Sequence, residues 1–579
     1  MSATASAPQL ARQAAQDIAD AFDRYNAEYR QITRRAPQRF DALDWQNAQK
    51  DAVERIELYG RFVDSTVAAL KVHLGEEAQE RFLWAEIKRR FEEIIAPQPD
   101  SEFRKTFFNS IGRTFFGTVG VDSAIEFVAL DLDPLSRIAD YEFLVTYPNR
   151  GSLELLFEEI LADFRTHARW RDFDRSVRQV AAEIERRCAT LGERRQATHV
   201  EMIRQPFYQL TRVYLVGRIV GRDWSMPLAI ALKNTERGLL IDAVMTTVDD
   251  LSILFSFTRS YFHVDLEYVG KAVLFLKQLM PHKAVSELFI VIGRAKQGKT
   301  ERYRELFRHL QTTDDRFVHA PGERGLVMVC FTLPSFDVVF KLIRDVFPVQ
   351  KNILRSDVLK KYELVFKRDR AGRLVDAQEF KRLRFPKDRF APELLEELLT
   401  ETASTVHVDG DDLIIDHCYI ERRMTPLNLY IRNATPEQAE HAVLDYGQAI
   451  RDLAYTNIFA GDLLLKNFGV TRHGRVIFYD YDELCLVTDC RFRELPQADS
   501  YEDEMRAETW YYVADNDVFP ETFINFLGFD DRLKAAFLAT HGEILTAAWW
   551  RGVQEKLKAN EVLEVLPYAA HRVRVASSA

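Results

Sequence analysis

The sequence predicts an α+β protein in which a mainly helical N-terminal domain with a small sheet precedes a bilobal C-terminal domain. Three observations support this. Apolar residues recur at spacings of three and four through the first 200 positions, and short runs rich in Val, Ile and Leu follow between 206 and 264. After position 320, strand-like runs are mixed with helical periodicity. We expect one domain at 1–315, with the β insertion near 206–264, and a second at 316–579.

The helical prediction begins at 10–32, where seven apolar residues share one helix face. These residues are Leu10, Ala14, Ile18, Phe22, Tyr25, Tyr29 and Ile32. Similar patterns predict helices at 51–72, 77–95 and 153–191. Further along, runs at 213–220 and 227–232 predict two strands, with a turn at Gly221-Arg222-Asp223 between them. The polar stretch near 312–320 marks the expected domain boundary.

Composition excludes several classes of protein. The chain has 579 residues and a net charge of −10, whereas nucleic-acid-binding proteins are typically basic. None of the five cysteines forms a CxxC pair, which argues against a structural zinc site and favours a reducing compartment. The first residues contain no apolar signal core, and no run of about 18 apolar residues occurs. We therefore expect a cytoplasmic protein with neither a membrane nor a nucleic acid as partner.

The C-terminal half opens with a glycine-bearing loop between strand-like runs. Gly322 and Gly325 precede apolar runs at 326–333 and 336–341, and the second run ends at Lys341. Glycines let backbone N–H groups approach phosphate oxygens, and a lysine on a following strand can bind the same phosphates. A plain hairpin turn and a solvated lysine are the alternatives for these two features taken alone. The spacing of sixteen residues from Gly325 to Lys341 suits a loop, a strand, a turn and a second strand.

The segments that follow add a strand, a candidate hinge, a capped helix and a hairpin. A strand is expected at 412–420, and 421–424 is a candidate adenine-binding hinge. Thr435 and Gln438 predict a capped helix start. The segment 457–483 then supplies Asp462 in a D-x-x-x-x-N spacing, followed by a hairpin that turns at His473-Gly474.

The asparagine of that spacing is Asn467, and Asp480 follows the second strand of the hairpin. Phosphoryl transfer requires a carboxylate beside the nucleophilic hydroxyl, together with an amide oxygen and a second carboxylate for Mg²⁺. Each feature alone has an ordinary structural explanation, but their order along the chain is that of a protein kinase. We therefore expect a protein-kinase-like fold that uses ATP and Mg²⁺.

With these motifs in view, the sequence resembles the bacterial isocitrate dehydrogenase kinase/phosphatase family over nearly its whole length. The matching segments are FFNSIGRTFF (107–116), TRSYF (258–262), APGERGLVMVCFTLPSFDVVFK (320–341), VDAQEF (375–380), YIERRMTPLN (419–428) and NIFAGDLLLKNFGVTRHGRVIFYDYDE (457–483). The resemblance implies a bifunctional enzyme that phosphorylates a serine of NADP-dependent isocitrate dehydrogenase, inactivates it, and later removes the phosphate. Isocitrate is thereby shared between the tricarboxylic acid cycle and the glyoxylate bypass.

The resemblance also implies site residues. ATP would bind through Ala320, Pro321, Gly322, Glu323, Arg324, Gly325, Leu326 and Lys341. The assigned active-site aspartate of the family matches Asp376, and AMP would act as an allosteric effector on the N-terminal domain. Lys296 and Lys299 are candidate phosphate contacts for AMP, with a solvated basic loop as the alternative.

Several residues depart from ordinary kinases. Ala460-Gly461 replaces the usual His-Arg before Asp462, and Asp480-Tyr481-Asp482 replaces Asp-Phe-Gly, so Asp482 is a further candidate metal ligand. Lys466 is a candidate to neutralise the moving phosphoryl group, and Glu363 is one candidate for the glutamate that pairs with the strand lysine. Two alternatives stay open: a small-molecule phosphotransferase of the aminoglycoside-kinase type, and a nucleotide sensor without catalysis. The oligomeric state, including a homodimer, is also open.

Overall fold

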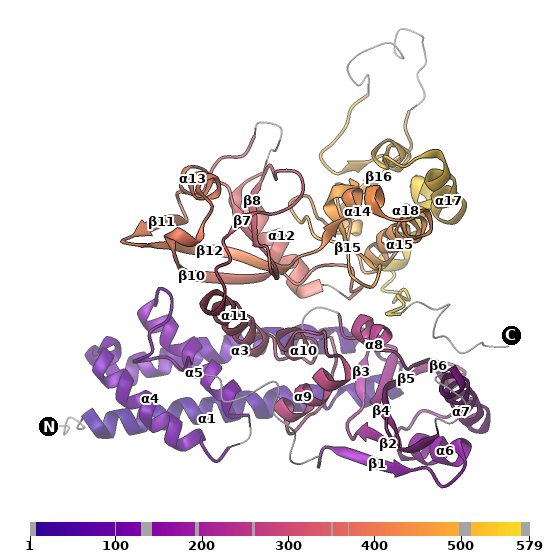
Figure 1. The fold of residues 1–579 in the computed structure, drawn as a ribbon, viewed down its shortest axis with the longest axis horizontal. Coiled ribbons are helices and arrows are strands. Elements are labelled where there is room, and N and C mark those ends of the chain that lie inside the picture. Colours follow the sequence, from indigo (N-terminus) through magenta and orange to yellow (C-terminus); the bar gives the residue numbers. More distant parts are fainter. Residues whose placement is uncertain are drawn as a thin grey trace. The chain divides into compact units, whose positions relative to one another are not determined.

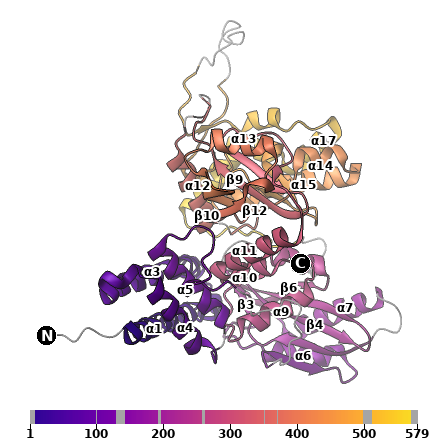
Figure 2. The same cartoon turned by 60° about the vertical axis from the view of Figure 1, so that its left-hand side comes forward.

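The computed structural model describes residues 7–98, 100–128, 142–190, 196–256, 261–348, 351, 353–368, 370–496 and 511–568. The chain forms two compact units (Figures 1 and 2). Unit 1 comprises Met1–Thr313, Arg382–Arg384 and Tyr568–Ala579, and unit 2 comprises Asp314–Lys381 and Phe385–Pro567. Residues 258–260 of the TRSYF motif lie outside the described part. Within that part, no helix is both long enough and apolar enough to cross a bilayer.

Unit 1 begins with a helical bundle, drawn in indigo and purple in Figure 1. Its helices are α1 (Ala7–Thr33), α2 (Ala36–Asp41), α3 (Trp45–Leu74), α4 (Arg81–Ile95) and α5 (Ser101–Phe116). The predicted face of the first helix is confirmed, because all seven of its apolar residues are buried against the bundle core. The stripe at 77–95 is interrupted, since a 3₁₀ turn ends at Gln79 before α4 begins.

A six-stranded antiparallel sheet follows the bundle. Its strands are β1 (Leu144–Pro148), β2 (Ala197–Ile203), β3 (Phe207–Gln209), β4 (Arg212–Gly221), β5 (Ser225–Thr235) and β6 (Gly238–Met245), in the order β1-β2-β4-β5-β6 with β3 beside β4. The predicted hairpin is confirmed, with Val220 opposite Ser225 across the turn. The predicted extent of the sheet is wrong at both ends. Strands β1 and β2 precede position 206, and 248–254 is helix α8 (Val248–Leu254) rather than sheet. β1 is only five residues long, too short for a periodic signal.

Helices cover the sheet and complete unit 1. Helices α6 (Leu153–Asp163) and α7 (Phe173–Thr190) share a core with the strands. The continuous helix expected at 153–191 is therefore wrong: the chain leaves the helix at Phe164, and Trp170 makes a parallel bridge to Leu239 of β6. Helices α9 (Val269–Leu279), α10 (Val285–Val291) and α11 (Ala295–Thr312) follow. Lys296 and Lys299 lie on the first turns of α11, not in a loop, and the Lys296 ammonium lies 5.8 Å from the centre of the Tyr59 ring.

The described end of the chain returns to unit 1. The Tyr568 hydroxyl donates a hydrogen bond to the Asp242 carboxylate of β6. The same carboxylate accepts from Arg212 Nε on β4 at 2.7 Å, and all three side chains are buried. Unit 2 is thus connected to unit 1 through the chain at both of its ends.

The first lobe of unit 2 is a six-stranded antiparallel sheet with two helices. The strands are β7 (Val318–His319), β8 (Met328–Leu333), β9 (Phe336–Ile343), β10 (Gln378–Pro386), β11 (Val406–Asp409) and β12 (Asp412–Arg422), in the order β10-β12-β9-β8-β7 with β11 beside β12. Helices α12 (Arg355–Arg368) and α13 (Pro392–Glu401) accompany the sheet. The three predicted strands correspond to β8, β9 and β12.

The second lobe of unit 2 is mainly helical. It contains β13 (Thr425–Pro426), α14 (Leu427–Asn433), α15 (Pro436–Tyr455), β14 (Phe468–Val470), β15 (Val476–Phe478), β16 (Arg491–Phe492), β17 (Asp517–Val518), α17 (Asp531–His541) and α18 (Ala547–Lys558). The predicted capping box is confirmed, since Thr435 and Gln438 exchange side chain to backbone hydrogen bonds. The predicted hairpin is β14–β15. The described chain therefore has the two-domain α+β layout that the sequence predicts.

Candidate functional site

The glycine-bearing loop lies between β7 and β8 and is held at its end by Arg344. Gly322 has a left-handed φ of 123°, and a Cβ on Gly325 would lie 2.7 Å from the Met328 carbonyl oxygen, so glycine is required at both positions. The Arg344 guanidinium donates to the Gly325 carbonyl at 3.1 Å. It also forms ion pairs with Glu397, at 2.8 Å, and with Glu401 of α13. The loop is exposed from Pro321 to Arg324 but anchored where it enters β8.

Lys341 is buried on β9, and its charge is matched by Glu421. Its ammonium lies 2.8 Å from the Glu421 carboxylate and donates to the Tyr479 carbonyl at 2.6 Å. Burial alone would lower the pKa of Lys341, but the nearby carboxylates, Glu421 first, reverse the shift and raise it. Glu421 was expected to begin a hinge, yet it belongs to β12 and its side chain meets Lys341. Glu363 is exposed on α12, which does not suit the paired glutamate.

Asp462 follows a glycine with a required conformation. Gly461 has a φ of 77°, and a Cβ there would lie 2.5 Å from the Glu483 carbonyl oxygen. The Asp462 carboxylate accepts from the Leu464 N–H at 2.9 Å, which fixes its rotamer. The Asn467 side-chain amide donates to the Asp462 carbonyl at 3.4 Å. The D-x-x-x-x-N spacing therefore folds into one tight loop, closed by the 3₁₀ turn Leu465–Asn467.

Asp376 lies just after a backbone pairing between two segments that are far apart in sequence. Leu374 makes a parallel bridge with Phe478, the last residue of β15. The Phe478 N–H donates to the Arg373 carbonyl at 2.8 Å, and the Val375 N–H donates to the Phe478 carbonyl at 3.2 Å. Asp376 follows Leu374 by two residues, and Asp480 follows Phe478 by two residues, so both aspartates leave the same backbone pairing. The Tyr481 hydroxyl, which donates to the Val375 carbonyl at 2.7 Å, supports this arrangement.

The carboxylates in this region repel one another. Burial, and then the charge of Asp482, raise the pKa of Asp480 to about 7, while Lys341 and Lys351 oppose the shift. Asp462 adds to the repulsion. One oxygen of Asp376, Oδ2, is buried and has no hydrogen-bond partner among the described residues. A buried carboxylate that repels its neighbours favours the binding of either a proton or a cation.

Two lysines near these carboxylates have partners. Lys351 Nζ lies 2.9 Å from an Asp482 oxygen and also contacts Glu483, so the candidate metal ligand Asp482 is ion-paired in this structure. Lys466 reaches back to Glu323 of the glycine-bearing loop at 2.9 Å. The sequence did not single out Lys351, which stands alone between strand β9 and helix α12 without a motif around it.

The donor set suits a hard divalent cation. Among the described residues, no three His, Cys, Asp or Glu side chains form a cluster that could hold a metal. Asn467 supplies an amide oxygen, however, and Asp480 a buried carboxylate whose charge is disfavoured without a counter-ion. Oxygen ligands of this kind are those Mg²⁺ prefers, and Mg²⁺ usually completes its shell with phosphate and water oxygens. The residues present therefore fit Mg²⁺ bound together with a nucleotide.

Comparison with known proteins gives matches along nearly the whole chain. Residues 315–570 match the model described as the kinase domain of isocitrate dehydrogenase kinase/phosphatase (AceK), and residues 15–314 match the regulatory domain of the same description. A protein of Anaeromyxobacter sp. (strain Fw109-5) named isocitrate dehydrogenase kinase/phosphatase is 47% identical, over 95% of this chain and 96% of its own length. One of Xanthomonas euvesicatoria pv. vesicatoria (strain 85-10) with the same name is 46% identical over 98% of both chains.

Proposed function

Because the chain belongs to the isocitrate dehydrogenase kinase/phosphatase family, we propose that it phosphorylates isocitrate dehydrogenase with ATP and removes the phosphate at the same site. The family membership rests on the matches to both domains and on relatives that align over nearly their full length. The acceptor in our proposal is a serine of NADP-dependent isocitrate dehydrogenase. The two reactions would set the flow of isocitrate between the tricarboxylic acid cycle and the glyoxylate bypass.

In the forward reaction, Asp462 orients and deprotonates the serine hydroxyl. Its carboxylate is fixed by the Leu464 N–H, so the second oxygen can face the substrate. Lys341 binds the phosphates of ATP, and Glu421 holds the ammonium charged and in place before the nucleotide arrives. Within residues 320–326, the backbone N–H groups contact the nucleotide from the other side, except at Pro321, which has none. Lys466 can leave Glu323, an exposed partner, to neutralise the transferred phosphoryl group.

Asn467 and Asp480 are the proposed ligands of Mg²⁺. When bound, the ion would neutralise the charge on the phosphate oxygens. Asp480 contributes a carboxylate that is only partly ionised near neutral pH until a cation arrives, because burial and Asp482 raise its pKa to about 7. Asp482 would join the site after releasing Lys351.

In the reverse reaction, Asp376 positions the water that attacks phosphoserine. The observation that supports a shared site is the parallel pairing of Leu374 with Phe478, because Asp376 and Asp480 each follow this pairing by two residues. A water held by Asp376 would then face a phosphate bound beside Asp480. No second phosphatase motif is needed for this reaction.

The test is phosphate transfer to purified isocitrate dehydrogenase, followed by release of the phosphate after the nucleotide is changed. We expect labelled phosphate to appear on the dehydrogenase with ATP and Mg²⁺, and to be lost when ATP is replaced by ADP. Transfer to a panel of small alcohols, with none to the dehydrogenase, would instead support a small-molecule kinase. Bound ATP with no turnover on any acceptor would support a nucleotide sensor. AMP is the effector that the family suggests, acting through unit 1.

A further inference from the structure

Unit 1 contains a groove that the catalytic proposal leaves without a role. It has a volume of about 600 Å³, within the range of roughly 300–1,000 Å³ typical of small-molecule sites. Its walls come from the end of α1, from β1 and β2, from the segment after α6, and from residues 263 and 265. All of the lining residues belong to unit 1.

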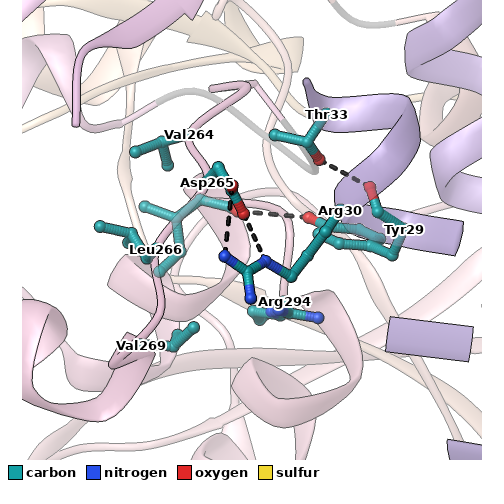
Figure 3. Close-up of a pocket in the computed structure, with 9 residues that line it drawn as sticks. Tyr29, Arg30, Thr33, Val264, Asp265, Leu266, Val269 and Arg294 are labelled. Atoms are coloured by element: carbon teal, nitrogen blue, oxygen red, sulfur yellow. Dashed lines mark hydrogen bonds and ion pairs between the residues drawn. The ribbon is translucent and has the colours of Figure 1, made fainter. Parts of the chain in front are cut away.

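One wall of the groove carries Asp265, whose negative charge is already neutralised by arginines. Asp265 accepts from Arg30 Nε at 2.5 Å and from Arg34 Nε at 2.6 Å. Figure 3 shows the Arg30 guanidinium directed onto this carboxylate, and both residues line a small neighbouring cavity. A second acid in the groove, Asp163, accepts a hydrogen bond from the Tyr147 hydroxyl at 3.0 Å. Two guanidinium groups thus hold one carboxylate at Asp265, so this wall keeps a positive charge.

Two further arginines in the groove have no partner for their charge. Arg165 and Arg204 both line it, and neither guanidinium has a hydrogen bond or an ion pair within the described parts of the chain. Both side chains are exposed, so they are hydrated in this state and free to reorient. Two guanidinium groups on one groove present a set of donors suited to a carboxylate or a phosphate.

The interior of the groove contains polar atoms that lack partners. His263 is only 9% exposed, and its Nε2 has no hydrogen bond among the described residues. Gln205 Oε1 is likewise buried and without a partner there. A buried polar atom left without a hydrogen bond costs roughly 1–3 kcal/mol, so such atoms at the wall of a groove point to a ligand. Burial holds the pKa of His263 well below its usual value, so the imidazole is neutral and suits an uncharged polar group.

Most of the remaining lining is apolar. It includes Val145, Ile160, Phe164, Met202, Tyr208 and Leu215. A bare inorganic anion would leave this surface uncovered. An anion attached to a ring or a short apolar body would cover it and still reach the arginines.

We propose that this groove binds a small anionic metabolite whose carboxylate or phosphate lies on Arg165 and Arg204 and whose apolar body, bearing a polar group, reaches His263 and Gln205. The ligand would stabilise unit 1 by mass action. This site is separate from the proposed nucleotide site, because every lining residue lies in unit 1 and the nucleotide residues lie in unit 2.

The test uses the full chain with ADP and Mg²⁺ present throughout, so that the nucleotide site is filled. Four probes are titrated by calorimetry: phenyl phosphate, benzoate, inorganic phosphate and benzyl alcohol. We expect phenyl phosphate or benzoate to bind more tightly than inorganic phosphate and than benzyl alcohol, which each lack one half of the ligand. The comparison of phenyl phosphate with benzoate tells which anion the arginines prefer.

The variant that tests the site is the double substitution Arg165→Ala with Arg204→Ala. Both residues are exposed, so the fold should survive, and the melting temperature of the ligand-free variant checks this. Loss of hydrogen bonds to a charged group predicts at least about tenfold weaker binding of the anionic ring probe. Arg178→Ala, an exposed arginine of α7 outside the groove, is the matched control and should bind as the parent does. The proposal would be overturned if none of the four probes bound at concentrations up to about 10 mM, or if the double variant bound the anionic ring probe as tightly as the parent.

Discussion

The Lys341 ammonium lies 2.8 Å from the Glu421 carboxylate, across the neighbouring strands β9 and β12. Tyr419 is paired with Lys341 in this register, and Glu421 lies two residues farther along β12, on the same face of the sheet. The lysine that we propose to bind the nucleotide phosphates is therefore held by a residue of a neighbouring strand and not by helix α12.

Lys341→Met should weaken ATP use by about tenfold to a hundredfold, because hydrogen bonds to charged groups contribute roughly 1.5–3 kcal/mol. The measurement is the KM for ATP and kcat with isocitrate dehydrogenase as acceptor. Glu421→Gln is the matched variant: it keeps a hydrogen-bond acceptor for the lysine, so its loss should be clearly smaller. Unchanged ATP kinetics in Lys341→Met would remove this lysine from the nucleotide site.

Asp480→Asn should abolish both transfer and release of phosphate, since the proposed metal ligand serves both directions. The same variant should be more stable than the parent at pH 8 without Mg²⁺. In the folded parent, the pKa of Asp480 is about 7, above its ordinary value of 3.8. The contribution of this carboxyl to the stability of the parent is therefore fully present at low pH and is lost as the pH rises through 7. The gain at pH 8 is on the order of 1–4 kcal/mol and should vanish near pH 4. Denaturant unfolding at the two pH values measures it.

Mg²⁺ binding in the presence of ADP should release protons near neutral pH. Asp480 must be ionised to bind the ion, so affinity should fall as the pH drops from 8 to 6. Calorimetry in two buffers of different ionisation enthalpy counts the protons, and Asp480→Asn provides the baseline. Equal affinity at both pH values would contradict a role for this carboxyl as a ligand.

Asp376→Ala should reduce the phosphatase rate by about 10²–10⁴-fold and the kinase rate far less, because only hydrolysis must position a free water. Asp411→Ala, an exposed aspartate at the β11–β12 turn, is the control and should leave both rates unchanged. Both rates and the melting temperature are measured. Equal losses in the two directions, accompanied by a lower melting temperature, would mean that Asp376 only supports the local fold.

Arg344→Ala should raise the KM for ATP several-fold with little change in kcat. The guanidinium joins the Gly325 carbonyl to Glu397 of α13, so its loss frees the end of the glycine-bearing loop without touching the reacting atoms. Arg344→Lys should recover only part of the parent's KM for ATP, because an ammonium cannot make the forked contacts. A fall in kcat with an unchanged KM would argue against this positioning role.

The parts of the fold that sequence predicts are those set by local patterns. The buried face of α1 follows from its spacing, the start of α15 from Thr435 and Gln438, and the β14–β15 hairpin from its turn residues. What the sequence does not reveal are pairings between distant segments. Glu421 meets Lys341 eighty positions away, and Leu374 meets Phe478 more than a hundred positions away. Neither pair leaves a signal within either local segment.

Pairing between distant segments also explains the two wrong predictions in unit 1, the extent of the sheet and the continuous helix at 153–191. Strands β1 and β2 are separated in sequence by α6 and α7, so no hairpin pattern joins them, and β1 is short and ends in proline. The break between α6 and α7 follows from Trp170 pairing with Leu239, a contact that helical periodicity cannot express.

The hydrogen bond from Tyr568 to Asp242 has a practical consequence for dividing this polypeptide into pieces. A protease that cuts once after Thr313 would separate the two stretches of sequence, yet Tyr568 would still bind the Arg212–Asp242 pair. We expect the two fragments to elute together from a sizing column, and replacement of Tyr568 by phenylalanine to weaken this association without abolishing it, because the segment Arg382–Arg384 also belongs to unit 1. A fragment that ends at Thr313 would be made without the hydroxyl that its buried aspartate binds.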